Sequence, residues 1–131
     1  MKLTKDTLLL AANTVRCLAA DMVESANSGH PGAPMGMADV AVSLWLKFLN
    51  IDPKEPTWEN RDRLVFSGGH ASSLVYALFY LSGMGGLRLE EIRNFRQFGS
   101  RAAGHPERGF EQIRVRREEL PVAYRHRERR V

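Results

Sequence analysis

Cysteine is almost absent from this chain of 131 residues, which contains Cys17 alone. A single thiol cannot form an internal disulfide, and it excludes a metal site built from several cysteines. The simplest compartment for such a chain is the reducing cytoplasm, where disulfides are rare. Cys17 itself lies among apolar neighbours, so we expect it to be a small core residue.

Long hydrophobic runs are also lacking. No apolar stretch reaches the roughly 18 residues that a membrane span requires, and the apolar residues 8–12 are soon followed by Asn13 and Arg16. We therefore expect no transmembrane helix, no signal peptide and no membrane partner. Hydrophobic residues make up 44% and charged residues 26% of the chain, which is typical of a globular protein.

Lysine is missing from residues 108–131, although this segment contains 8 arginines and 4 glutamates. It supplies the whole net charge of +4, because residues 1–107 carry 11 basic and 11 acidic side chains. The sequence therefore divides into a domain at 1–110 and an arginine-rich tail at 111–131. We expect the tail to be disordered or frameshifted, since arginine without lysine is typical of an out-of-frame reading of GC-rich coding DNA.

Hydrophobic periodicity predicts helices joined by loops that are rich in glycine and proline. A helix at 5–27, capped by Thr4, would carry an apolar stripe at Leu8, Ala12, Val15, Ala19, Met22 and Val23. Further helices are predicted at 37–49, 71–81 and 89–98, with a short buried strand at 64–66. A strand, a glycine turn and a helix in succession indicate an α/β fold, in which ligands bind at the carboxyl ends of strands.

Three of the four histidines, His30, His70 and His105, lie in predicted loops beside glycine. Histidine is the side chain most easily poised for proton transfer near neutral pH, and glycine lets a ligand approach the backbone. For each one alone, the alternative is a surface histidine or one that is hydrogen-bonded for structural reasons. No HxH or HxxxH spacing and no carboxylate cluster accompanies them, so we expect no metal site built from these histidines.

The segment Ser67-Gly68-Gly69-His70 lies between the predicted strand and the helix at 71–81. Its backbone N–H groups could bind a phosphate group at the start of that helix. The segment is neither a Walker loop nor a GxGxxG turn. A tight turn without a ligand explains its residues equally well.

Taken in order, the motifs of the chain resemble the amino-terminal part of transketolases. They are SGHPGAPMGMAD at 28–39, PTWENRDRLVFS at 56–67, GHAS at 69–72, NFRQF at 94–98 and GHPE at 104–107. The resemblance extends from residue 4 to residue 110. It implies a three-layer α/β fold that binds thiamine diphosphate, of which this chain would contain a helix-rich part.

The resemblance also implies a function in the pentose phosphate pathway, with thiamine diphosphate and Mg²⁺ as cofactors. Such an enzyme moves a two-carbon ketol group from a ketose phosphate to an aldose phosphate. By matching motifs, His30 would contact the substrate and assist proton transfer as the catalytic residue. His70 would contact the cofactor diphosphate, and His105 would hydrogen-bond the donor sugar. The complete family enzyme is a homodimer with its active site between subunits.

The chain departs from the family pattern at several positions. Gly68 stands where the family usually has asparagine, and Ala103 where it commonly has proline. A threonine- and glycine-rich loop is replaced by the tail, and the sequence does not contain the G-D-G motif and asparagine that hold Mg²⁺ in the family. The glutamate that activates the cofactor belongs to a second domain. We therefore expect this chain to be inactive by itself and to bind thiamine diphosphate weakly.

Two alternative functions follow from other features of the sequence. The chain could be a non-catalytic fragment that pairs with a full-length transketolase subunit through apolar surface. It could also be a small basic protein that binds nucleic acid through its tail arginines. Nucleic-acid binders usually interleave aromatic and basic residues, whereas Tyr124 is the only aromatic residue beyond Phe110. This difference argues against a nucleic-acid partner.

Sequencing the coding DNA from codon 100 past codon 131 tests the frameshift interpretation of the tail. We expect a one-base change, or a shifted downstream frame, to restore the threonine- and glycine-rich loop and the G-D-G motif. An intact frame with no such motifs downstream would instead indicate a genuine short protein, and the catalytic interpretation would then be abandoned.

Overall fold

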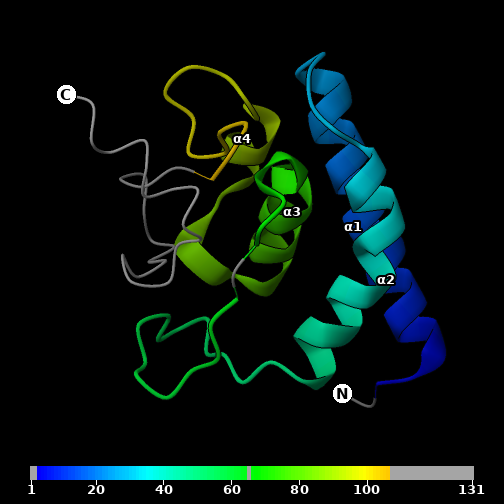
Figure 1. Cartoon of the computed structure of the whole chain (residues 1–131), viewed down its shortest axis with the longest axis vertical. Helices are drawn as coiled ribbons and strands as arrows, with labels where there is room; N and C mark the ends of the chain where they lie inside the picture. The colour runs from blue at the N-terminus through cyan, green and yellow to red at the C-terminus, as the bar shows by residue number, and fades with distance from the viewer. Residues whose placement is uncertain (1–2, 65, 107–131) are drawn as a thin grey trace.

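The computed structural model describes residues 3–64 and 66–106, so the tail predicted at 111–131 lies outside the described residues. The elements in chain order are α1 (Lys5–Ser25), α2 (Gly32–Lys47), η1 (Gly69–Ala71), α3 (Ser72–Ser82), η2 (Met84–Gly86) and α4 (Leu89–Arg93). Helices α1 and α2 lie side by side, and α3 packs between this pair and α4 (Figure 1). Within the described residues, no helix is long and apolar enough to cross a membrane.

Helix α1 confirms the predicted cap and apolar stripe. The Thr7 N–H donates to the Thr4 hydroxyl at 3.2 Å and the Thr4 N–H donates to the Thr7 hydroxyl at 3.0 Å, which closes a capping box. The buried residues of the helix are Ala12, Val15, Ala19 and Met22, with Leu8 and Val23 partly buried. Cys17 is exposed, so its prediction as a core residue is wrong. It follows the buried Val15 by two positions, which places it on the far side of the helix.

Helix α2 begins at Gly32 rather than at the predicted Met37. Pro31 is its N-cap residue and Pro34 falls in its first turn. Proline costs no helical hydrogen bond there, because the first N–H groups of a helix have no carbonyl partner within it. The prolines that indicated an irregular turn therefore start the helix instead.

Arg16 of α1 forms polar contacts with α2. Its guanidinium forms an ion pair with Asp39 and donates a hydrogen bond of 3.1 Å to the Met35 carbonyl. It also donates to the Asn13 side chain on its own helix at 2.9 Å. The contacts with Asp39 and Met35 join the middle of α1 to the first half of α2.

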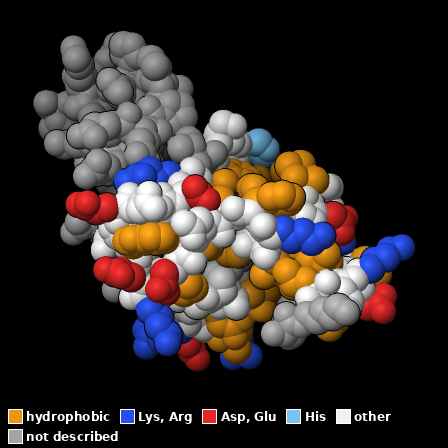
Figure 2. All heavy atoms as spheres, turned by 90° about the horizontal axis from the view of Figure 1, so that it is seen from below, with side chains coloured by type: hydrophobic (Ala, Val, Ile, Leu, Met, Phe, Trp, Pro, Cys, Tyr) orange, Lys and Arg blue, Asp and Glu red, His pale blue; other side chains and the backbone are white. Residues whose placement is uncertain are grey.

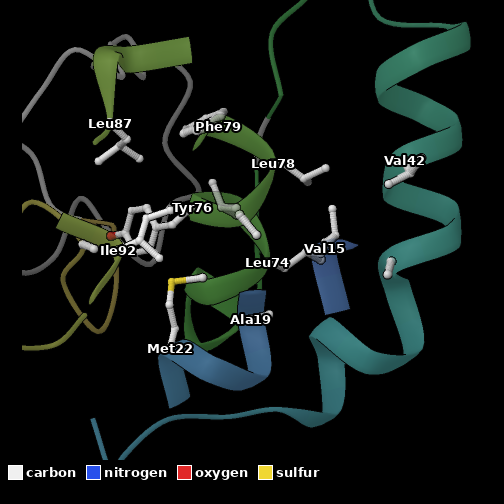
Figure 3. Close-up of a cluster of buried hydrophobic side chains, with 14 of the residues drawn as sticks. Val15, Ala19, Met22, Val42, Leu74, Tyr76, Leu78, Phe79, Leu87 and Ile92 are labelled. Carbon is white, nitrogen blue, oxygen red and sulfur yellow. The ribbon is translucent and has the colours of Figure 1, made fainter. Parts of the chain in front are cut away.

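Helix α3 lies at the centre of the hydrophobic core. Every residue from Ala71 to Phe79 is buried, as expected for a helix whose sequence is apolar on all sides. Its side chains lie between Val15 of α1 and Ile92 of α4 (Figure 3). The helix ends at Ser82, one residue beyond the predicted end, and its C-cap residue Gly83 adopts a left-handed φ of 74°.

Two predicted elements differ from the structure. Leu64 and Phe66 belong to no helix or strand, and Val65 lies outside the described residues. A strand requires a second strand for its hydrogen bonds, and the described residues include none. The helix predicted at 89–98 is shorter, because Arg96 adopts a left-handed φ of 62° and donates its N–H to the Ala102 carbonyl at 2.8 Å.

Large apolar side chains also lie on the surface. Leu10 is 67% exposed and Phe48 is 73% exposed. Figure 2 shows hydrophobic side chains gathered between charged ones on the face that it presents. Apolar surface of this kind is typical of faces that pack against further protein.

Replacing Leu74 by alanine should lower the free energy of unfolding by about 2–5 kcal/mol, because the leucine is fully buried in α3 and its truncation leaves a cavity. Leu10→Ala is the matched control, since this leucine is largely exposed on α1; we expect a change within about 0.5 kcal/mol. Urea unfolding followed by far-UV circular dichroism measures both. Equal effects from the two substitutions would contradict the central position of α3.

Candidate functional site

His30 lies in the turn between α1 and α2. The preceding Gly29 has a φ of 143°, and a Cβ at this position would lie 2.8 Å from Cγ2 of Val23. Glycine is required here, because a side chain would meet both a disfavoured backbone conformation and the α1 surface. The turn therefore packs closely on α1, while the His30 side chain stays exposed.

His70 lies in η1, directly before α3. The Ala71 N–H donates to the Gly68 carbonyl at 2.8 Å, which closes the tight turn that the sequence suggested. Because α3 is buried, this turn is fixed relative to the core, and the His70 side chain is exposed. The start of a helix carries N–H groups that suit an anion. Phosphate binding by this turn therefore stays a prediction, and a tight turn without a ligand remains the alternative.

His105 lies in the loop that follows α4. The Ser72 hydroxyl donates to the Gly104 carbonyl at 2.7 Å, so the first residue of α3 holds this loop. A Cβ on Gly69 would lie 3.1 Å from Cδ2 of His105, which places the imidazole directly against this glycine. The absence of a side chain at Gly69 therefore permits the approach of His105 to η1.

The structure brings the three predicted histidines together. The rings of His30 and His70 meet edge to face, with centroids 5.3 Å apart and planes at 74°. His105 packs on Gly69, the residue before His70. All three side chains are exposed, and none of the imidazoles forms a hydrogen bond with another described residue. This arrangement does not fit histidines that are hydrogen-bonded for structural reasons within the described residues, and a role of the three imidazoles in binding stays a prediction.

The described residues offer no obvious metal centre. Among residues 3–64 and 66–106, no group of three or more His, Cys, Asp or Glu side chains is arranged to hold an ion. An open hollow lies elsewhere, between the start of α1 and the end of α2. It is lined by Leu3, Thr4, Lys5, Leu8, Leu9, Asp39, Ser43 and Lys47. The histidine cluster does not contribute to this hollow, so the candidate site is the cluster itself.

Sequence analysis missed two residues that shape the cluster. Ser72 belongs to the motif GHAS, but its bond to Gly104 joins positions 32 residues apart and leaves no local signal. Arg96 belongs to NFRQF, and its guanidinium lies against Gly104. The motifs therefore contained both residues, while their contacts depend on the folding of the chain.

Comparison with known proteins decides the family. The family described as "Transketolase, thiamine diphosphate binding domain" matches residues 8–116 of the chain. The chain belongs to the transketolase family. This result confirms the resemblance of its motifs to transketolase and the partial α/β fold, of which the described residues form a helix-rich part.

Individual transketolases match most of this chain. The transketolase of Halalkalibacterium halodurans is 55% identical over 107 residues, which are 82% of this chain and 16% of the relative. A crystal structure of transketolase from Campylobacter jejuni has a TM-score of 0.77 and 56% identity, covering 80% of this chain and 16% of that one. Transketolase of Pichia stipitis in complex with sedoheptulose-7-phosphate has a TM-score of 0.71 and 48% identity, covering 74% and 14%. The chain thus spans about one sixth of the length of its relatives.

Gly29→Ala should destabilise the chain by about 1–3 kcal/mol, because the new Cβ would clash with Val23 and the left-handed φ would be strained. It should also move the NMR signals of the His30 ring. Gly32→Ala is the matched control, since nothing lies within 4 Å of a Cβ at the first residue of α2. Thermal unfolding and histidine NMR spectra of both variants test this prediction. A Gly29→Ala variant as stable as Gly32→Ala would contradict it.

Proposed function

We propose that the three histidines are part of the cofactor- and substrate-binding site of a transketolase. The observation that carries the proposal is their convergence from three separate loops, with the imidazoles exposed and unbonded among the described residues. Membership of the transketolase family supports it. The reaction is the transfer of a two-carbon ketol group from a ketose phosphate to an aldose phosphate, in the cytoplasmic pentose phosphate pathway.

His70 is the residue that would hold thiamine diphosphate, through its diphosphate group. Its exposed imidazole stands at the start of the buried helix α3, and the adjoining Gly68 and Gly69 leave the backbone accessible. An imidazole beside the positive end of a helix suits a diphosphate. Thiamine diphosphate, when bound, supplies the carbon nucleophile that accepts the two-carbon unit. Mg²⁺ would accompany the diphosphate, and the described residues contain no ligand set for it.

His30 and His105 would act on the sugar. The ring edge contact places His30 beside His70, and therefore next to the cofactor position. An exposed imidazole there can move a proton at the reacting carbon. His105, packed against Gly69 of η1, can donate and accept hydrogen bonds through its two ring nitrogens, which suits the hydroxyl groups of a ketose donor.

The exposed apolar surface favours a second candidate function. Leu10 and Phe48 are largely exposed, which suits a fragment that packs against a complete transketolase subunit. The complete enzyme would be a homodimer, so either function involves a second chain. Co-purification with a complete transketolase favours the pairing function, whereas a folded monomer that does not bind the complete enzyme argues against it.

A chimeric enzyme tests the catalytic proposal. Residues 1–106 of this chain replace the matching segment of the Campylobacter jejuni transketolase, which is 56% identical. We expect the chimera to transfer ketol groups and His30→Ala to lower kcat by about 10²–10⁴-fold, as for loss of a proton-transfer group. His70→Ala should weaken thiamine diphosphate binding, and His105→Ala should raise the KM of the ketose donor. The 131-residue chain alone should show no ketol transfer.

Cys17→Ala is the control variant for these measurements, because Cys17 is exposed on α1, a helix that carries none of the three histidines. It should leave kcat, KM and cofactor affinity unchanged in the chimera. An active chimera that tolerates alanine at His30, His70 and His105 alike would exclude the proposed roles.

A further inference from the structure

We propose that Arg96 is a positioning residue, which holds the Gly104-His105 turn so that the His105 imidazole stays against Gly69. The importance of this role for catalysis rests on the proposed function of His105. The contact between His105 and Gly69 is independent of that function, because residues of this chain alone form it.

The backbone of Arg96 brings the chain back toward η1. Arg96 adopts a left-handed φ of 62°, and its N–H donates to the Ala102 carbonyl at 2.8 Å. This hydrogen bond closes the loop between the end of α4 and Ala102, so the following Gly104 and His105 return to the start of α3. A left-handed conformation is uncommon for a residue other than glycine and persists only where the surrounding structure holds it.

The side chain of Arg96 packs on the turn that its backbone creates. A Cβ on Gly104 would lie 3.0 Å from Cζ, 3.1 Å from Nε and 3.1 Å from Nη2 of Arg96. Three atoms of one guanidinium at nearly equal distance indicate that its flat face covers Gly104. The same guanidinium carbon lies 6.0 Å from the ring centroid of Phe95, which is buried. The guanidinium therefore connects the Gly104 backbone to a fixed aromatic ring of the core.

Two features of Arg96 cost stability. Its backbone is left-handed, and its Nη1 is buried with no hydrogen-bond partner among the described residues. Glycine at this position would avoid both costs. Such local costs are typical of residues whose geometry serves a nearby site, and the nearest functional candidate along the loop is His105.

Gly104 is held from two directions. Arg96 covers it from the α4 side, and the Ser72 hydroxyl of α3 donates to its carbonyl at 2.7 Å. His105 follows directly, so a shift or tilt of Gly104 moves the imidazole away from Gly69. Arg96 thus controls the position of His105 without belonging to the histidine cluster.

NMR spectroscopy of the 131-residue chain tests the proposal. The readout is the nuclear Overhauser contact between the His105 Cδ2 proton and the Gly69 Cα protons, together with the His105 ring shifts. We expect Arg96→Lys to lose this contact and move the His105 signals, because lysine keeps the charge but not the flat face. The contact between the His30 and His70 rings should persist. Arg93→Lys, on the exposed side of α4, is the matched control and should change neither contact.

A double-mutant cycle provides the second measurement. Gly104→Ala should displace His105, since the new Cβ would meet the guanidinium. The same change in an Arg96→Gly background should cause no further displacement, because the obstructing atoms are absent and glycine suits the left-handed φ. Additive displacements, or a wild-type His105 contact in Arg96→Lys, would overturn the proposal. Loss of the His30–His70 contact together with that of His105 would also overturn it, by showing a general structural role. These outcomes stand whether or not the chimeric enzyme is active.

Discussion

The burial of α3 on every side is the constraint on which the other elements depend. Its residues from Ser72 to Phe79 have no exposed face, so α1, α2 and α4 must all pack around it. Removing this much apolar surface from water is the largest favourable contribution available to so short a segment. The first residue of the helix, Ser72, also holds Gly104. The same element therefore organises the core and anchors two of the three histidine loops.

Close approaches at glycine turn this helical core into a candidate site. Gly29 lets the His30 turn pack on Val23, and Gly69 lets the His105 ring lie against η1. A Cβ at Gly29 would stand 2.8 Å from Val23, which is closer than packed atoms tolerate, and a Cβ at Gly69 would stand 3.1 Å from His105, which is tighter than most packed contacts. The histidines reach one another because their glycine neighbours have no side chain. This explains why the glycines and the histidines of the motifs belong together physically.

Much of the local structure could be predicted from the sequence, because it depends on local interactions. The cap at Thr4, the stripe through Val15 and the stop at Gly83 arise from contacts between near neighbours. The predicted start of α2 is wrong because proline is common both in loops and in the first turn of a helix, so Pro34 alone does not distinguish the two. The predicted strand at 64–66 failed for a different reason, since a strand depends on a partner segment that local sequence does not specify.

For the site, the sequence by itself determined the chemistry: three imidazoles, each beside glycine, in motifs that resemble those of transketolases. Only the tertiary structure decided that the imidazoles share one place, through the His30–His70 ring contact and the packing of His105 on Gly69. It also decided the surroundings, through the bond from Ser72 to Gly104 and the left-handed turn at Arg96. The physical reason is the separation along the chain of the residues that interact. Helix caps and turn motifs depend on residues close in sequence, whereas these contacts join distant segments that only burial around α3 brings together.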